Sequence, residues 1–467
     1  MRPKSLHVVS LNSYRTALVA RIVPALITGV FIACTFSARA QETVQEEQTV
    51  QADQTVQEEP LPSSVDYSVA QIGTFPPPSS PYALDSSKGV AAGESDLSAE
   101  PRRFHYSLRL TVRGVYDDNI NISHSNRISD YYFAIEPAIT IGFGDIEGRG
   151  RNYIRLDYMP SVILFVDHSE EDAVQHLIHL EGRHQFSRLT LTLSQDVAIL
   201  DGANLNSTLD TTGLQANVDV STPTRLNLFT TRLRANYELS GKLFLTGEFD
   251  ASIFDYPDFI SSAILSGGLY INYNWTPKVV VGIGGTFGWD LVDDPNTEQT
   301  FEQANVHLQY QMTGKLSLTA SAGVEIRQFD GRRDDRISPV FEVGAIYHPF
   351  DGTSVTLAAV RRMLNSGFFA NQDFAATAVV LRVQQRLLQR FYLGLAAGYE
   401  NSDYFSTVRG VSATRDDDYY FVEPSVDVLI TRFWSAGVYY LHREDSSTLN
   451  FFSFYDNQVG VRTTIRF

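Results

Sequence analysis

Hydrophobic and polar residues alternate with a period of two over most of the chain, from residue 105 onward. In "NLFTTRLRANYEL" (227–239), Phe229 and Leu233 share one face, whereas Arg232 and Arg234 share the other. This spacing is typical of β-strands, whose successive side chains point to opposite faces. It predicts eighteen strands, which begin near residues 105, 131, 153, 174, 189, 228, 243, 263, 279, 301, 316, 338, 353, 374, 391, 418, 434 and 452.

The connections between these segments are short and long in turn. "SGK" (240–242) and "TPK" (276–278) are short, whereas "DLVDDPNTEQT" (290–300) is long and polar. The segments span about 10–13 residues, which suits tilted membrane strands of about 9–11 residues better than the usual soluble strands of about 5–6. Lipid excludes unpaired strand edges, so the sheet must close. We therefore expect an all-β fold over residues 102–467: a closed, up-and-down, antiparallel transmembrane β-barrel of about eighteen strands, with sixteen as the alternative count.

The first 101 residues differ in character. A basic start precedes the apolar run Ile22–Phe36 and the small residues "ARA" at 38–40, which is typical of a cleaved secretory signal peptide over residues 1–40. Residues 41–101 begin with the repeats "TVQEEQ", "TVQADQ" and "TVQEEP" and continue as a proline-rich polar chain, which predicts a disordered acidic tail. A lipoprotein would be acylated at Cys34, but "FIAC" lacks the usual leucine three residues before the cysteine.

The chain is acidic, and this narrows its partners. Its formal net charge is −17, and removing the five basic residues of the leader gives −17 − 5 = −22. Such a chain has no electrostatic reason to bind nucleic acid. The signal peptide and the predicted barrel indicate the bacterial outer membrane. The expected partners are outer-membrane lipids and lipopolysaccharide, the barrel-insertion machinery and small hydrophilic solutes, and a homo-oligomer is left open.

Aromatic residues fall near both ends of the predicted strands, as in the interfacial girdles of membrane barrels. Trp275, Trp434, Phe244 and Phe391 lie near short turns, and Tyr116, Tyr131, Trp289, Tyr399 and Tyr419 lie near long loops.

The last segment alternates apolar residues up to a terminal aromatic, like the signal read by the insertion machinery: Val459, Val461, Ile465 and Phe467. Three prolines inside strands, Pro137, Pro160 and Pro424, each lose a ladder hydrogen bond and predict bulges or bends.

Two hairpins of the chain match each other. "GVYDDNINIS" followed by "DYYFAIEP" (114–137) aligns with "GYENSDYFS" followed by "DDYYFVEP" (398–424). This pattern resembles that of the outer-membrane β-barrel porin-2 family, some members of which are encoded beside exopolysaccharide genes. The resemblance covers about residues 100–467. It implies an outer-membrane barrel, and it implies no catalytic residues.

Candidate chemistry is sparse. Asp117, Asp118 and Asn119 supply oxygens for a calcium ion, but no glycine-punctuated loop with a closing glutamate follows. We therefore favour a solvated hairpin turn. His176 and His179 lie on opposite faces of one strand and cannot jointly bind a metal without a bulge. No G-x-S-x-G motif occurs in the sequence, so we expect no enzyme activity and no catalytic, cofactor or metal site.

The polar face of the strands carries the residues that we expect to line a pore. An eighteen-stranded barrel is wide enough for an aqueous channel. The candidates are Arg155, Arg183, Arg232, Arg234, Glu238, Glu248, Asp250, Arg327, Arg382, Arg386, Glu423, Asp427, Arg462 and Arg466. Closure would place the arginines of the first and last strands together as a basic wall. Glu238, Glu248 and Asp250 would give the region around the sixth and seventh strands acidic character, and an interior ion-pair network would produce the same pattern.

The longest connection is the third outer loop, Asp201–Asn227. Its leucines and Val218 would pack inside the barrel if the loop folds inward to narrow a pore, and an outward loop is the alternative.

The pattern as a whole predicts a passive, porin-like diffusion channel. The alternatives are an accessory barrel for exopolysaccharide export or surface anchoring, and a structural barrel with a plugged lumen.

Overall fold

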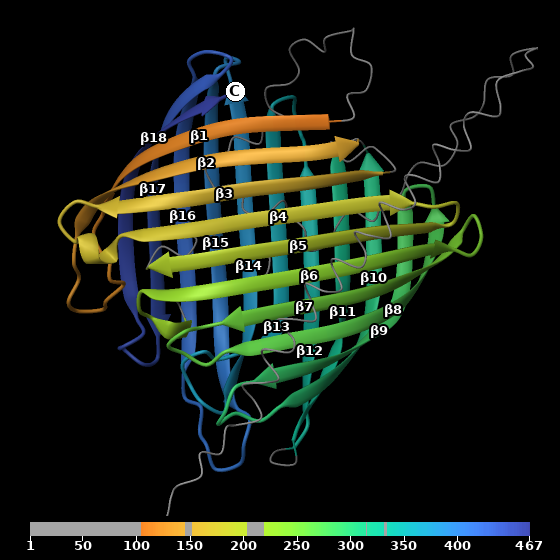
Figure 1. Cartoon of the computed structure of the whole chain (residues 1–467). Helices are drawn as coiled ribbons and strands as arrows, with labels where there is room; N and C mark the ends of the chain where they lie inside the picture. Colours follow the sequence, from red (N-terminus) through yellow and green to blue (C-terminus); the bar gives the residue numbers. More distant parts are fainter. Residues whose placement is uncertain (1–103, 145–151, 203–218, 314, 331–333) are drawn as a thin grey trace, which may run out of the picture. The chain divides into compact units, whose positions relative to one another are not determined.

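The chain forms one antiparallel sheet of eighteen strands in the residues that the computed structural model describes, 104–144, 152–202, 219–313, 315–330 and 334–467 (Figure 1). The signal peptide and the tail predicted for residues 1–101 lie outside these residues. The strands are β1 (Phe104–Asp117), β2 (Asp130–Gly144), β3 (Tyr153–Phe165), β4 (Ala173–Gln185), β5 (Leu189–Gly202), β6 (Thr224–Glu238), β7 (Leu243–Asp255), β8 (Ser262–Thr276), β9 (Val279–Val292), β10 (Gln299–Thr313), β11 (Leu316–Phe329), β12 (Arg336–Tyr347), β13 (Thr353–Asn365), β14 (Gln372–Leu387), β15 (Phe391–Ser406), β16 (Asp416–Leu429), β17 (Trp434–Ser447) and β18 (Phe454–Arg466), and a 3-10 turn, η1 (Ser169–Glu171), precedes β4.

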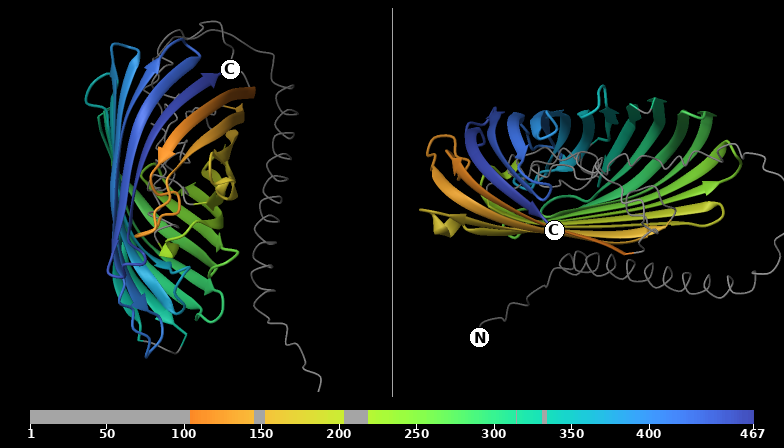
Figure 2. Two further views of the ribbon diagram at one scale, coloured as in Figure 1. Left: turned by 90° about the vertical axis from the view of Figure 1, so that its left-hand side faces the viewer. Right: turned by 90° about the horizontal axis from the view of Figure 1, so that it is seen from above.

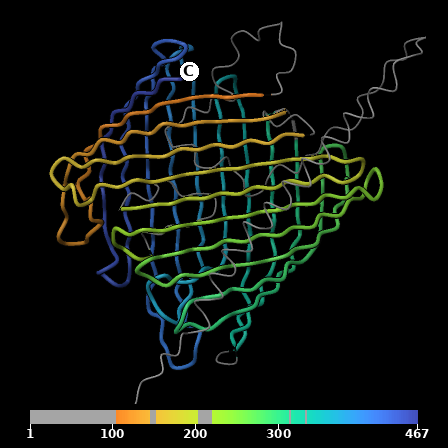
Figure 3. The backbone as a smooth tube through the Cα atoms, viewed as in Figure 1, coloured from red at the N-terminus to blue at the C-terminus, as the bar shows by residue number. Residues whose placement is uncertain are grey.

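Each strand pairs with the next, and β1 also pairs with β18, which closes the sheet into a barrel. The prediction of a closed barrel of eighteen strands is confirmed. The largest error in a predicted start is at β6, expected near residue 228 and found at Thr224. Strands β1–β9 form one side of the barrel and β10–β18 the other (Figure 2). The backbone trace shows each strand turning back beside its predecessor (Figure 3).

The two faces of the sheet have opposite chemistry. Ile283, Leu269 and Val461 are 65%, 61% and 57% exposed on the outer face, whereas Glu325 and Arg327 are buried on the inner face. An apolar exterior around a polar interior is the arrangement that lipid requires. No helix among the described residues is long and apolar enough to cross a membrane.

Most of the predicted girdle residues lie on the exposed outer face: Trp275, Trp434, Phe391, Tyr116, Tyr131, Trp289 and Tyr399. Two predictions were wrong. Tyr419 pairs with Glu400 and Asp445 on the inner face and is 1% exposed, so its neighbour Tyr420 takes the outer position. Phe244 pairs with Glu238 on the inner face as well. In both cases the side chain's position in the alternation, and not its distance from the turn, decides where it points.

The prolines interrupt the strand pairing on one side only, and the register is the same before and after each gap, so the predicted bulges do not occur at these positions. The β2–β3 register passes from Ile135↔Val162 to Ile139↔Tyr158 and skips the residues around Pro137 and Pro160. The β16–β17 register likewise skips Pro424. The terminal apolar residues Val459, Val461 and Phe467 are all exposed on the outer side.

Candidate functional site: the barrel lumen and its outer end

All fourteen predicted pore-lining residues lie on the inner wall of the barrel. Each is an even number of residues along its strand from a side chain that faces inward, so it points to the same face. Arg155 is opposite Glu181, Arg183 is opposite Tyr153, and both share the inner face with buried Asp157. The other inward positions are Arg232, Arg234, Glu238, Glu248, Asp250, Arg327, Arg382, Arg386, Glu423, Asp427, Arg462 and Arg466. All fourteen positions therefore lie on the inner face of the sheet.

The acidic region around β6 and β7 is largely neutralised by its own neighbours. Arg232 Nε lies 2.6 Å from Asp250 Oδ1, and Arg234 Nε lies 2.8 Å from Glu248 Oε1. Glu238 lies exposed at the short-turn end of β6. These pairs agree with the ion-pair network that the sequence left open, and they weaken the acidic character expected of this wall.

The basic wall forms where the first and last strands meet. The β1–β18 register puts Arg109 opposite Arg466 and Arg113 opposite Arg462. Arg462 is held by Asp427 through two hydrogen bonds, and Arg113 Nη2 lies 2.5 Å from Glu136 Oε1. Like charges thus face each other across the seam, and acids from the neighbouring strands pair with Arg113 and Arg462.

Charged side chains on well-separated strands influence one another across the interior of the barrel. Glu342 on β12 lies within electrostatic reach of Arg232 and Arg234 on β6, six strands away along the sheet. His307 on β10 lies within reach of Arg234 as well. The charges of these walls are therefore close enough to be coupled electrostatically.

The third outer loop folds inward at its end. Asp219 accepts hydrogen bonds from Tyr404 Oη (2.8 Å), Ser366 Oγ (2.9 Å) and Gly367 N (2.6 Å). Val220, which is fully buried, packs with Leu200, Leu226 and Tyr256. Residues 203–218 of this loop lie outside the described residues, but its end joins the wall of β5–β6 to β13–β15 on the far side.

Arg415 holds this junction from the loop between β15 and β16. Its Nη1 donates to Asp219 O (2.7 Å), and its Nη2 lies 2.6 Å from Asp417 Oδ2. The guanidinium stacks 3.6 Å from the centre of the Phe452 ring and 4.5 Å from that of Tyr404. Burial lowers the pKa of Arg415, but Tyr404, Asp417 and Asp219 outweigh that effect and raise it. We call Asp219, Ser366, Gly367, Tyr404, Arg415 and Phe452 the outer latch.

The connection between β13 and β14 is the centre of these contacts. Ile260 N donates to Gly367 O (2.8 Å), and Thr407 N donates to Asn371 O (2.9 Å). Phe368 contacts Phe259, Phe369, Phe451 and Phe452. Loops from five of the strand pairs, β5–β6, β7–β8, β13–β14, β15–β16 and β17–β18, thus meet at the long-loop end of the barrel. We call it the outer end because long loops face outward in such barrels.

The outer part of the β13–β14 hairpin leans across the lumen. β12 pairs with β13 only between Phe341↔Arg361 and Tyr347↔Val355. Beyond that point, Asp373 of β14 lies 3.7 Å from Arg327 of β11, which also binds Asp290 (2.9 Å) and Glu325 (2.8 Å). Arg327 is therefore a buried hub that joins β9, β11 and β14. It does not face open solvent, as a simple pore-lining role would require.

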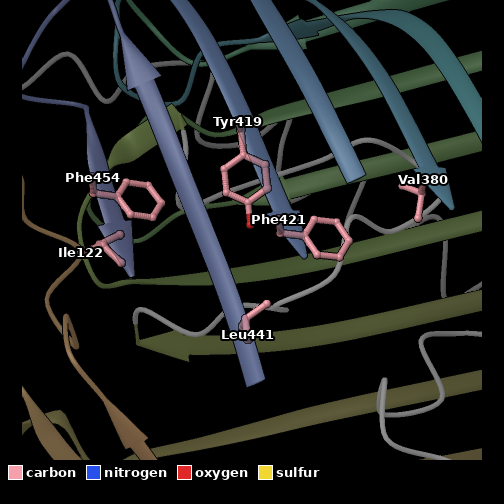
Figure 4. Packing of buried hydrophobic residues seen from close by; sticks show 6 residues of the cluster. All are labelled: Ile122, Val380, Tyr419, Phe421, Leu441 and Phe454. Carbon is pink, nitrogen blue, oxygen red and sulfur yellow. The ribbon is translucent and has the colours of Figure 1, made fainter. Parts of the chain in front are cut away.

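The first outer loop also enters the barrel, which corrects the expectation of a solvated turn. Asp117 and Asn119 are 0% exposed, and Ile122 belongs to a buried apolar cluster with Tyr419, Phe421, Leu441 and Phe454 (Figure 4). Asn119 Nδ2 donates to Ser123 O (3.0 Å) and Tyr455 O (2.7 Å). The loop turns on these bonds toward the lumen, because its isoleucines can be buried there.

The histidines lie as alternation predicted. His176 faces outward beside Tyr158, whereas His179 faces inward and lies 2.6 Å from Asp196 Oδ1. Ser194 donates to Asp196 and not to His179. A serine nucleophile needs its hydroxyl within reach of the histidine, so this trio does not form that arrangement.

No family model matches the sequence, and no curated protein matches it. The resemblance to the porin-2 family therefore stays a prediction. Among solved structures, OpdK of Pseudomonas aeruginosa matches 78% of this chain and 98% of its own, at 11% identity and a TM-score of 0.38. OccAB3 of Acinetobacter baumannii matches 78% of this chain and 99% of its own, at 11% identity and a TM-score of 0.38. OccK2 (OpdF) of Pseudomonas aeruginosa matches 77% of this chain and 98% of its own, at 12% identity and a TM-score of 0.40. Because these TM-scores lie below 0.5, the likenesses do not by themselves indicate a shared function.

Proposed function

We propose that the protein is a porin-like passive channel of the bacterial outer membrane for small hydrophilic solutes, narrowed at its outer end. The observation that carries this proposal is the charged inner wall of a closed barrel with an apolar exterior. Burying charge is costly, and a barrel that served only as a structural element could fill its interior with apolar side chains. Arginines on β14 and β18 and their partners instead line the wall along the length of the strands.

The charge distribution favours anionic or dipolar solutes. Glu248 and Asp250 are paired with arginines, whereas the seam brings four arginines together, Arg109, Arg113, Arg462 and Arg466. Arg382 lies near Glu423, which also faces Arg462 and Arg113. A wall of this kind orients solutes that carry a negative group.

Planar-bilayer recording of the purified full chain tests the channel. We expect ion conductance with a preference for anions. Arg382→Gln together with Arg386→Gln should shift the reversal potential toward cation selectivity. Arg188→Gln, an exposed arginine in the short turn before β5, is the matched control and should leave selectivity unchanged. A folded protein that shows no conductance would contradict the proposal, and an unchanged selectivity in the double variant would contradict the role of the arginines.

A plugged barrel is the second candidate, and the outer latch favours it. Loops from several strand pairs close over the outer end, and Glu342 approaches the opposite wall. A plugged barrel would not conduct even when the latch is opened by mutation, whereas a narrowed channel would. The accessory role in exopolysaccharide export or surface anchoring, which the family resemblance implies, stays a prediction. Loss of surface polysaccharide on deletion of the gene would support it.

A further inference from the structure

Three carboxylates converge at the outer end of the seam that closes the barrel. Asp117 ends β1, Asp118 follows it, and Asp456 lies on β18. One carboxylate oxygen of each lies within 4.8 Å of the others. Asp117 and Asp456 are 0% exposed, and the side chain of Asp118 is 24% exposed. Two of these three acids are therefore shielded from bulk water.

The hydrogen-bond donors around the cluster leave part of it unsatisfied. Asp456 Oδ2 accepts from Arg443 Nε (2.6 Å) and from Gln458 Nε2 (3.0 Å). Asp456 Oδ1 is buried and has no hydrogen-bond partner. A buried carboxylate oxygen without a donor is costly. This orphan oxygen, on a side chain that converges with two other carboxylates, points to a missing positive ligand.

The three acids outnumber the arginines beside them. Arg443 binds Asp456 and Arg127 lies near Asp118, which leaves about one negative charge by simple count. Arg127 reaches Asp118 only at 3.7 Å and is partly exposed.

We propose that Asp117, Asp118 and Asp456 bind a calcium ion. Calcium accepts six to eight oxygen ligands in irregular geometry, whereas magnesium requires a near-ideal octahedron. Each aspartate would supply one oxygen, and water would complete the shell from the partly exposed side at Asp118. The ion joins the first strand to the last, next to the pair Asp117↔Gln458 that ends the β1–β18 register. It therefore clamps the closure of the barrel and the base of the inward first loop.

The test uses the purified full chain in a lipopolysaccharide-free, non-ionic detergent after chelator treatment. Calcium should raise the midpoint of thermal unfolding, and terbium should bind with sensitised luminescence that calcium displaces. Asp118→Asn, at the most exposed of the three positions, should fold and lose both responses, and Asp456→Asn should lose them as well. Asp290→Asn is the matched control, because it removes a buried acid from another cluster and should keep both responses.

Hydrogen exchange distinguishes a clamp at the seam from binding elsewhere. Calcium should slow exchange in peptides that cover β1 and β18 more than in those that cover β6 and β7. The proposal is overturned if calcium leaves the unfolding midpoint of the parent protein unchanged, or if Asp118→Asn keeps the full response. A midpoint that depends on pH but not on calcium would also overturn it. In that case a proton shared by Asp117 and Asp456, which lie within hydrogen-bonding reach, would account for the unpartnered oxygen of Asp456.

Discussion

Removing the side chain of Arg415 should open the outer latch. This arginine is 2% exposed and binds Asp417 at 2.6 Å and Asp219 O at 2.7 Å. Removing one partner of a buried ion pair costs about 3–5 kcal/mol, and a desolvated cation–π contact adds about 2 kcal/mol. If about 3 kcal/mol of this interaction energy favours the closed latch over an open one, Arg415→Ala shifts the closed-to-open equilibrium about a hundredfold. Each 1.4 kcal/mol changes an equilibrium constant tenfold.

Single-channel recording in planar bilayers measures this shift. We expect Arg415→Ala to have a larger conductance or a longer open time than the parent protein. Arg409→Ala is the matched control from the same loop. Its side chain is 74% exposed and pairs with Asp334, which is 88% exposed, and such surface pairs contribute about 0–1 kcal/mol. The control should therefore differ from the parent by a few-fold at most.

Two further variants sharpen the result. Arg415→Lys keeps the charge but loses the planar fork that binds Asp417 and stacks on Phe452, so it should give an intermediate effect. Deleting residues 204–222 removes Asp219 from the other side of the same contact and should also raise conductance. A folded Arg415→Ala protein with unchanged conductance and open time would refute the idea that the latch narrows the channel.

Two predictions concern stability. A Cβ atom at Gly460 would lie 2.2 Å from the Tyr439 ring. Gly460→Ala should therefore lower the free energy of unfolding, measured by chemical denaturation, by about 1–3 kcal/mol. Gly241→Ala is the control and should leave this free energy unchanged, because a Cβ atom there would have no other atom within 4 Å. Burial and then the carboxylate of Asp255 raise the pKa of Asp293 in the loop after β9. The folded protein therefore holds the proton on Asp293 more tightly than the unfolded chain does. As a result, ionisation of Asp293 destabilises the protein when the pH rises above the ordinary pKa of an aspartate. Asp293→Asn should therefore raise the thermal midpoint at pH 7 and leave it unchanged near pH 3; an equal gain at both would rule out ionisation as the cause.

The barrel could be predicted from the sequence because alternation carries two facts at once. It gives the strand, and it gives the face on which each side chain lies. Arg232 and Asp250, for example, were assigned to the same inner face from parity alone, and the register places them opposite each other. The error at Tyr419 has the same basis. Its neighbour Tyr420 is equally aromatic, and only the register to Glu400 and Asp445 decides which of the two faces inward.

The contents of the lumen could not be predicted in this way. Parity says that a side chain points inward, but the interior of a barrel can hold either water or protein. The latch joins Asp219 to Tyr404, which is 185 residues away in sequence, and to Arg415, which is 196 residues away. No local pattern encodes such a pairing, and in isolation each of these polar residues resembles an ordinary solvated loop residue.

The outer loops nevertheless contain a signal that points inward. A loop that stays in water gains nothing from large apolar residues, whereas Ile120, Ile122, Val220 and Phe452 each lie at or below 3% exposure. Burying such side chains contributes about 1.5–3 kcal/mol each, enough to draw the loops inward and to carry the neighbouring aspartates with them. The burial of Asp117 and Asp219 is then a consequence of the apolar residues beside them. It follows that replacing Ile122 by a polar residue should release the first loop and expose Asp117, while the eighteen-stranded wall remains closed by its own hydrogen bonds.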